Sequence, residues 1–312
     1  MEYHFIVNPT AGKKDQSQVI PAQIMAVSEK VGVAAEHCHI VTTQYKGHAR
    51  VLAKEIAQQG VPCAIFSVGG DGTFNEVLNG AYLYENAIVG CIPHGSGNDF
   101  LRSFGERDAF LDLEAQFLGQ ALEIDLIQSE NGVSAAICSV GLDAKIAYGI
   151  PKFRRLPLCG GSMAYNLSIA QCLLGKLGQK LTITLDGEVV HKNCLMVAVC
   201  NGKAYGGGFY AAPEANLTDG FLDVMIIAKM PLLRVAKVIS VYKKGNHLKN
   251  GEIVPEMADV ITFCRAKTVS ITPQQVGESM LLNEDGECAP STLLQATILP
   301  KAAKIILPRG VS

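Results

Sequence analysis

The segment that decides the fold is Cys63-Ala-Ile-Phe-Ser-Val-Gly-Gly-Asp-Gly-Thr-Phe-Asn-Glu-Val-Leu-Asn-Gly80. Its first six residues are mostly apolar, which predicts a buried strand. After a glycine-rich turn, Phe74, Val77, Leu78 and Ala81 recur at helical spacing and predict an amphipathic helix. The segment therefore predicts a strand, a tight turn and a helix, from which parallel α/β sheets are built.

The turn in this segment has the features of an anion site. Gly69, Gly70 and Gly72 let backbone amides approach a ligand closely, and the following helix presents unpaired N–H groups and its positive dipole end. The chain contains neither a Walker A loop nor a G-x-G-x-x-G fingerprint. Since a carboxylate repels phosphate, we expect Asp71 to join a Mg²⁺ network or to position the loop. Capping of the helix is the structural alternative.

The first part of the chain alternates strand-like and helical patterns, which is typical of a mostly parallel sheet. Strands are expected at 4–8, 36–42, 63–68 and 87–92, with helices at 17–31 and 47–59. We therefore expect an α/β nucleotide-binding domain over residues 1–125. The strand-like tail at 296–312 is a candidate for a further strand of this domain.

Residues 126–295 have a different pattern and predict a β-rich second domain. Strands are expected at 132–140, 181–185, 193–200, 222–227, 260–263 and 267–271. Asp186-Gly187 between two such runs indicates a hairpin. Residues 163–177 look helical and follow the basic residues Lys152, Arg154 and Arg155, which form either a solvated loop or a contact for anionic lipid headgroups.

Composition excludes several classes of protein. The 312 residues carry 27 Lys and Arg against 29 Asp and Glu, so the charge does not favour nucleic acid as a partner. The ten cysteines are scattered without a CxxC pair, which disfavours a zinc or redox motif and favours a reducing compartment. There is no signal peptide and no apolar run of ~18 residues, so we expect a cytoplasmic protein without a transmembrane segment.

Several segments together carry a family resemblance. Val68-Gly-Gly-Asp-Gly-Thr73 resembles the signature of the diacylglycerol kinase catalytic-domain superfamily, although Gly-Gly-Asp-Gly also occurs in NAD kinases. Further matches follow in the family's order along the chain: Asn8 to Gly12, Thr43 before Gly47, Ile92 to Phe100, Asn201-Gly202, Gly206 to Phe209, Pro213 to Val224, and Asp285-Gly286-Glu287. This co-linear set resembles the bacterial soluble lipid kinases of diacylglycerol or sphingosine kinase type.

The resemblance implies a fold and a reaction. The fold is an N-terminal α/β domain like those of NAD kinase and phosphofructokinase, followed by a β-sandwich domain. The reaction is ATP-dependent and Mg²⁺-dependent phosphorylation of diacylglycerol or a related lipid alcohol, taken from a membrane surface by peripheral association. A homodimer is an open alternative to a monomer. The rival functions are an NAD kinase-like activity on a soluble substrate and a non-catalytic lipid- or nucleotide-binding regulator.

The resemblance also assigns nucleotide-binding positions, mostly through backbone amides and hydroxyls. They are Asn8, Pro9, Thr10, Ala11, Gly12, Thr43, Gly69, Gly70, Asp71, Gly72, Thr73, Asn75, Glu76, Gly95, Ser96, Asn98 and Asp99. Ser96 stands where the family usually has threonine, and Leu101 follows Phe100 where alanine is common.

The catalytic positions come from the last matching segment and from the glycine-rich turn. Glu287 is the proton acceptor implied by the resemblance, Asp285 is close enough to share that role, and Asp71 acts on the ATP side. A solvated hairpin turn is the alternative for the Asp285 and Glu287 pair.

Two metal sites are expected. Asp71, Asp99 and Asp125 follow successive strand-like units and could converge on Mg²⁺ at one sheet edge, although Asp99 could also cap a helix and Asp125 could mark a domain boundary. The resemblance implies a second, structural cation held by Asp219 and the carbonyl groups of Asn216 and Phe221. An ordinary Asp-Gly turn is the alternative at Asp219.

Overall fold

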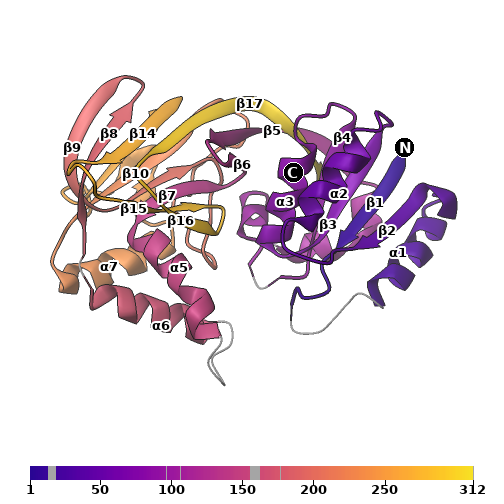
Figure 1. The fold of residues 1–312 in the computed structure, drawn as a ribbon, viewed down its shortest axis with the longest axis horizontal. Coiled ribbons are helices and arrows are strands. Elements are labelled where there is room, and N and C mark those ends of the chain that lie inside the picture. Colours follow the sequence, from indigo (N-terminus) through magenta and orange to yellow (C-terminus); the bar gives the residue numbers. More distant parts are fainter. Residues whose placement is uncertain (13–18, 96, 106, 155–161, 176, 312) are drawn as a thin grey trace. The chain divides into compact units, whose positions relative to one another are not determined.

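The computed structural model describes residues 1–12, 19–95, 97–105, 107–154, 162–175 and 177–311. The chain divides into two compact units, one formed by Met1–Leu126 with Pro300–Ser312 and the other by Ile127–Leu299. It leaves the first unit within strand β5 (Gln120–Ser129) and returns within strand β17 (Leu294–Leu307). Figure 1 shows the elements of both units.

The first unit contains a parallel sheet. Strands β1 (Glu2–Val7), β2 (Cys38–Thr42), β3 (Cys63–Gly69) and β4 (Ala87–Pro93) lie in the order β2-β1-β3-β4, each parallel to its neighbours. Strand β17 extends the sheet beside β4. Every residue of β3 is buried, because a central parallel strand is covered on both faces. The four strands expected from the sequence are therefore present.

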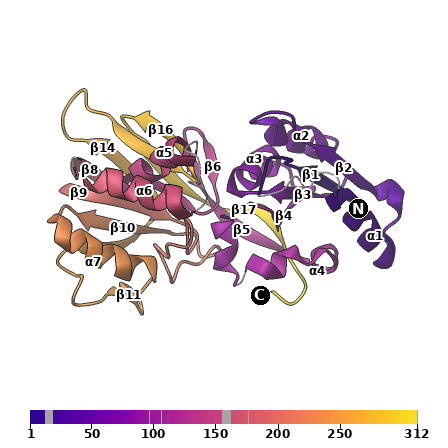
Figure 2. The same ribbon diagram turned by 90° about the horizontal axis from the view of Figure 1, so that it is seen from below.

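Helices cover both faces of this sheet. Figure 2 shows α2 (His48–Ala57) and α3 (Asp71–Ala81) on one face, with α1 (Val19–Lys30) and α4 (Leu113–Phe117) on the other. On the α1 side, Ile20 and Ile24 belong to the same buried cluster as the stacked rings of Phe5 and Phe66. The amphipathic helix expected after the glycine-rich turn is α3, and its buried side chains include Phe74, Val77, Leu78 and Ala81.

The second unit is organised around the long strand β9 (Glu188–Cys200). Its first half pairs with β8 (Gln179–Leu185), and its second half lies between β7 (Ile137–Gly141) and β10 (Leu222–Ala228), all antiparallel. The remaining strands are β6 (Gly132–Ser134), β11 (Leu248–Lys249), β12 (Glu252–Ile253), β13 (Ile261–Ala266), β14 (Thr268–Pro273), β15 (Met280–Glu284) and β16 (Glu287–Ser291). Buried side chains from most of these strands form one apolar core.

Helices of the second unit depart from the expectations. Helix α6 (Ser162–Leu173) ends four residues before the expected limit of 177, and Gly175 follows it. Helices α5 (Leu142–Arg154) and α7 (Leu232–Lys243) were not expected. The signal for α7 was the spacing of Val235, Val238 and Tyr242, which form its buried face after Pro231 at the N-cap.

One expected strand and one expected turn illustrate the local chemistry. The run at 132–140 is interrupted between β6 and β7, because the N–H groups of Ala135 and Ala136 donate to the Asp285 carboxylate instead of a neighbouring strand.

The hairpin predicted at Asp186-Gly187 is present, and both residues have the positive φ of a type I′ turn. Short 3₁₀ helices lie at Ala35–His37, Asp99–Ser103 and Arg107–Leu111.

Candidate functional site

Three loops follow the carboxyl ends of adjacent strands β1, β3 and β4 in the first unit. Asn8 ties the first loop to the second, because its Nδ2 donates to Thr73 Oγ1 at 3.0 Å. Its Oδ1 accepts from the Thr10 N–H at 3.0 Å and the Thr10 hydroxyl at 2.9 Å. The carboxyl edge of a parallel sheet is where α/β proteins bind their ligands, so these loops form the candidate nucleotide site.

Asp71 ties the second loop to the third. Its Oδ2 accepts from the Asn98 N–H at 2.7 Å, and its Oδ1 accepts from the Asp99 N–H at 3.0 Å. Burial raises the pKa of Asp71 above its ordinary value, and the two backbone N–H groups act against that shift. Both carboxylate oxygens are thus used to position backbone, which matches the positioning role considered for Asp71.

The glycines of these loops bring the backbones together. A Cβ at Gly97 would overlap the Asp71 carboxylate, and one at Gly95 would overlap the backbone of Gly70. At Gly12, whose φ is +83°, a Cβ would lie 2.6 Å from the His94 carbonyl oxygen. Only glycine permits approaches this close, so the three loops form one continuous backbone surface.

Arg107 supports the third loop and was missed in the sequence. Its Nη2 donates to the carbonyl oxygens of Pro93 at 2.6 Å and Gly95 at 3.0 Å. The guanidinium therefore brings a positive charge to the β4 end. Burial lowers the pKa of His94 below its ordinary value, and the Arg107 charge adds to that shift. A single arginine outside any motif offered no signal of this role.

Other predicted nucleotide-binding residues have mixed positions. Thr43 follows β2 and its N–H donates to Val7 at the end of β1, so it lies at the same sheet edge. The Glu76 carboxylate instead accepts from the N–H groups of Gly47 at 2.8 Å and Ala49 at 3.2 Å, which caps helix α2. The side chain of Asn75 accepts from Asn79 within α3. Ser96 lies outside the described residues.

The predicted three-carboxylate Mg²⁺ network is not assembled. Asp99 Oδ1 accepts from Arg102 Nε at 3.0 Å, and the buried Asp125 accepts from the Lys301 N–H at 2.8 Å. Among the residues that the structure describes, no group of three or more His, Cys, Asp or Glu side chains could hold a metal ion. In this structure each of these three carboxylates serves its own hydrogen bonds or ion pair.

The predicted catalytic pair lies on a tight hairpin of the second unit. Asp285 and Gly286 connect β15 to β16 with positive φ angles of 46° and 96°. Asp285 accepts from the N–H groups of Ala135, Ala136 and Ile137, with closest distances of 2.6, 3.1 and 2.8 Å. Glu287 is exposed at the start of β16 and pairs in register with Glu284. The two acids therefore differ, since Asp285 is an anchor whereas Glu287 is accessible.

Asp143 is a further carboxyl group that the sequence reasoning missed. It lies in the first turn of α5 and is buried. Burial raises its pKa to about 6. The available signal was an aspartate two residues after the strand that ends at Gly141.

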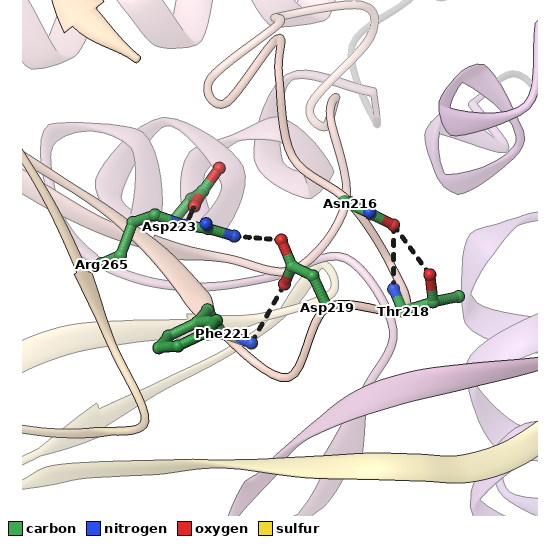
Figure 3. Close-up of polar contacts among 6 residues, drawn as sticks. All are labelled: Asn216, Thr218, Asp219, Phe221, Asp223 and Arg265. Atoms are coloured by element: carbon green, nitrogen blue, oxygen red, sulfur yellow. Dashed lines mark hydrogen bonds and ion pairs between the residues drawn. The ribbon is translucent and has the colours of Figure 1, made fainter.

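The predicted structural cation loop is shown in Figure 3. Asn216 accepts from the backbone N–H and the hydroxyl of Thr218. Asp219 accepts from the Phe221 N–H at 3.1 Å and forms an ion pair with Arg265.

The basic residues considered as contacts for lipid headgroups lie at the end of α5. Lys152 Nζ lies 5.9 Å from the ring centroid of Phe153, and Arg155 lies outside the described residues.

Comparison with known proteins places both units in one family. The protein-family model described as diacylglycerol kinase catalytic domain matches residues 2–129. A second family model, described as YegS C-terminal NAD kinase beta sandwich-like domain, matches residues 136–307. The chain belongs to the diacylglycerol kinase family. It is a lipid kinase, and ATP is the phosphoryl donor of such an enzyme.

Relatives agree with this assignment, and a solved structure agrees with the fold. A diacylglycerol kinase of Bacillus subtilis (strain 168) is 29% identical over 285 residues, covering 90% of this chain and 88% of the relative. One from Staphylococcus carnosus (strain TM300) is 26% identical over 308 residues, covering 98% and 95%. A crystal structure of a diacylglycerol kinase from Bacillus anthracis str. Sterne has a TM-score of 0.71 at 22% identity, covering 100% of this chain and 98% of that chain.

These findings confirm the predicted fold class, an α/β nucleotide-binding domain followed by a β-sandwich-like domain. They also confirm the predicted enzyme class of lipid kinase. Among the residues that the structure describes, no helix is both long enough and apolar enough to cross a bilayer.

Proposed function

We propose that this lipid kinase transfers the γ-phosphate of ATP to the free hydroxyl of diacylglycerol, or of a closely related lipid alcohol, and so forms phosphatidic acid or its analogue. We further propose that Glu287 is the general base. The three-loop backbone surface at the carboxyl edge of the first unit is the observation that carries the ATP half. The diacylglycerol half rests on the names of the relatives.

The loops supply the binding and positioning that phosphoryl transfer requires. The positive end of α3, which begins at the glycine-rich turn, holds the phosphates. The Asp71 carboxylate accepts from the N–H groups of Asn98 and Asp99, and so fixes the third loop beside the start of α3. The guanidinium of Arg107 donates to the carbonyl oxygens of Pro93 and Gly95, and its positive charge offsets part of the phosphate charge.

In this proposal Mg²⁺ binds together with ATP, through the phosphates. The carboxylates of Asp71, Asp99 and Asp125 do not fit a shared protein site for the ion, because they already have protein partners. Mg²⁺ usually keeps several waters and binds through substrate phosphates with few protein ligands. When bound, it would neutralise phosphate charge, and the side chains would act by positioning.

Glu287 suits proton transfer because of its exposure and its support. The Asp285 carboxylate fixes the turn by three backbone hydrogen bonds, so the residue two places later has a defined position. A carboxylate can accept the hydroxyl proton as the phosphoryl group is transferred. In this scheme Asp285 is a positioning residue and takes no part in proton transfer.

The substrate class is tested with a lipid panel. Purified protein with Mg²⁺ and γ-labelled ATP is offered diacylglycerol, monoacylglycerol and a sphingoid base in mixed micelles, and NAD in solution. We expect label in phosphatidic acid and dependence on micelles. Label in NAD alone would establish the rival soluble-substrate activity. Binding of ATP and lipid with no transfer to any acceptor would establish the non-catalytic alternative.

The first prediction concerns Glu287. Glu287→Gln keeps the shape of the side chain but removes the proton acceptor, so turnover should fall at least ~100-fold while ATP affinity is unchanged. Glu188→Gln is the matched control, because Glu188 follows the Asp186-Gly187 turn just as Glu287 follows Asp285-Gly286. Turnover is measured with saturating lipid, and ATP affinity by calorimetry. Equal turnover of the two variants would remove Glu287 from the mechanism.

A further inference from the structure

The loop Asn216 to Phe221 in the second unit contacts the cationic side chain of Arg265. Arg265 on β13 donates from Nη2 to Asp219 Oδ2 and from Nε to Asp223 Oδ1, the latter at 3.1 Å. Figure 3 shows the guanidinium between the two aspartates. Its central carbon also lies 4.8 Å from the centroid of the Phe221 ring. One guanidinium therefore contacts two carboxylates and one aromatic face.

This arrangement is built into the strands. Asp223 and Arg265 are opposite residues in the antiparallel pair β10 and β13, so the register itself places the guanidinium beside the loop. Asp223 is buried, with 5% of its surface exposed, and the arginine supplies the positive charge that a buried carboxylate needs. The planar guanidinium can serve two acceptors at once, which a lysine ammonium does less well.

The same contacts leave no place for a divalent ion at Asp219. Its Oδ1 accepts from the Phe221 N–H and its Oδ2 from Arg265, so both oxygens are used. A divalent ion bound there would also lie close to a side chain that stays charged at all ordinary pH values. Lys267 adds a second positive charge, with Nζ 5.4 Å from the centroid of the Phe221 ring. The residues present therefore do not fit the structural cation that the resemblance implied.

We propose that Arg265 takes the place of a structural metal ion in this chain. Its guanidinium neutralises Asp219 and Asp223 and holds the Asn216 to Phe221 loop in its folded conformation, so the second unit folds without a divalent cation. This role is independent of the proposed substrate and of the general base.

The test is the effect of divalent ions on thermal stability without nucleotide. Wild-type protein should unfold at the same temperature in excess EDTA and in millimolar Mg²⁺ or Ca²⁺. Arg265→Gln should unfold several degrees lower in EDTA, and divalent ions should restore part of the loss because the aspartates become available as ligands. Mn²⁺ binding followed by electron paramagnetic resonance should show one additional site in this variant, and Asp219→Asn in the same chain should abolish it.

Arg234→Gln is the matched control. Arg234 forms an exposed ion pair with Asp259, with Nη2 and Oδ1 2.6 Å apart, so its loss removes an arginine without opening the loop. It should create no metal dependence. The proposal is overturned if divalent ions stabilise the wild type and Asp219→Asn abolishes that stabilisation. If Arg265→Gln does not fold, the wild type and Asp219→Asn still decide the question. No stabilisation of the wild type by divalent ions supports the proposal, and stabilisation that Asp219→Asn abolishes overturns it.

Discussion

At the scale of single residues, carboxyl groups that look alike in the sequence have different environments. Asp71 and Asp285 accept backbone hydrogen bonds from segments far away in the chain. Glu287 is exposed, and Asp143 is buried. A buried carboxyl group costs free energy to ionise, whereas an exposed one does not. Burial therefore separates these acids into anchors, a candidate base and a titrating core group.

The second prediction follows from the pKa of Asp143. Burial raises this pKa from 3.8 to about 6, so the folded state favours the protonated form. The stability linked to this proton is fully present below the unfolded pKa and is lost as the pH rises through the folded pKa. Between roughly pH 5 and pH 8 the wild type should lose about 1–2 kcal/mol relative to Asp143→Asn, whose amide does not ionise.

Urea unfolding of both proteins at the two pH values, followed by tyrosine fluorescence, measures this difference. Asp186→Asn is the control, because hydrogen bonds from Lys267 and Thr268 outweigh desolvation and lower the pKa of Asp186. The stability linked to Asp186 is present above its unfolded pKa, so the control should differ from wild type equally at both pH values. A pH-independent difference for Asp143→Asn would show that Asp143 does not titrate in this range.

At the scale of elements, side chains connect one element to the start of another. Glu76 of α3 caps α2, Asp186 accepts from the N–H groups of Lys267 and Thr268 at the β14 start, and Asp285 does the same before β7. Both Asp-Gly hairpins thus use their aspartate twice, once for the positive φ of the turn and once as an acceptor for a neighbouring strand. Such links fix the loops on which a site depends.

The third prediction concerns the link between α3 and the loop after β4. Asp71→Asn removes a charge and one of two acceptor oxygens, and losing hydrogen bonds to a buried charged group costs about 1.5–3 kcal/mol. We expect kcat/KM for ATP to fall about 10- to 100-fold. The Mg²⁺ concentration for half-maximal activity at saturating ATP should not change, because Asp71 positions backbone. Glu55→Gln, which removes an exposed charge from α2, should leave both values unchanged.

A shift of that Mg²⁺ concentration in Asp71→Asn, with unchanged use of ATP, would contradict the positioning role. It would return Asp71 to the metal network that the sequence suggested.

At the scale of the whole molecule, the chain leaves the first unit and returns to it through two strands. Asp125 of β5 and Lys301 of β17 are joined by a hydrogen bond of 2.8 Å within the first unit, close to both crossing points. Lys301 has a positive φ of 51°, which a non-glycine residue adopts only when its surroundings hold it there. Asp125 thus ties the returning strand to the departing strand.

The fourth prediction tests this link. Asp125→Ala should lower the free energy of unfolding by about 1–3 kcal/mol, because the Lys301 N–H loses its acceptor. Asp125→Asn keeps an acceptor oxygen and should have a smaller effect. ATP affinity and Mg²⁺ dependence should match the wild type in both variants. Thermal unfolding and calorimetry give these quantities, and normal stability with an altered Mg²⁺ requirement would place Asp125 at the metal instead.

The sequence by itself determined the order of strands and helices in the first unit, the Asp-Gly hairpin at 186 and the location of the glycine-rich loops. These features depend on local periodicity, on turn chemistry and on the absence of a Cβ, all of which are visible in a short stretch. The lipid kinase class came instead from the resemblance of several segments, in the family's order, to the diacylglycerol kinase family.

Only the tertiary structure decided what each acidic side chain does. The partners of Asp71, Asp125, Asp219 and Asp285 lie 27, 176, 46 and up to 150 positions away. A carboxylate binds whichever donor folding brings to it, whether a backbone N–H, an arginine or a metal, and sequence spacing does not encode that choice. For this reason the glycine-rich turn was predicted correctly, whereas the hydrogen-bond partners of Asp71 were visible only in the tertiary structure.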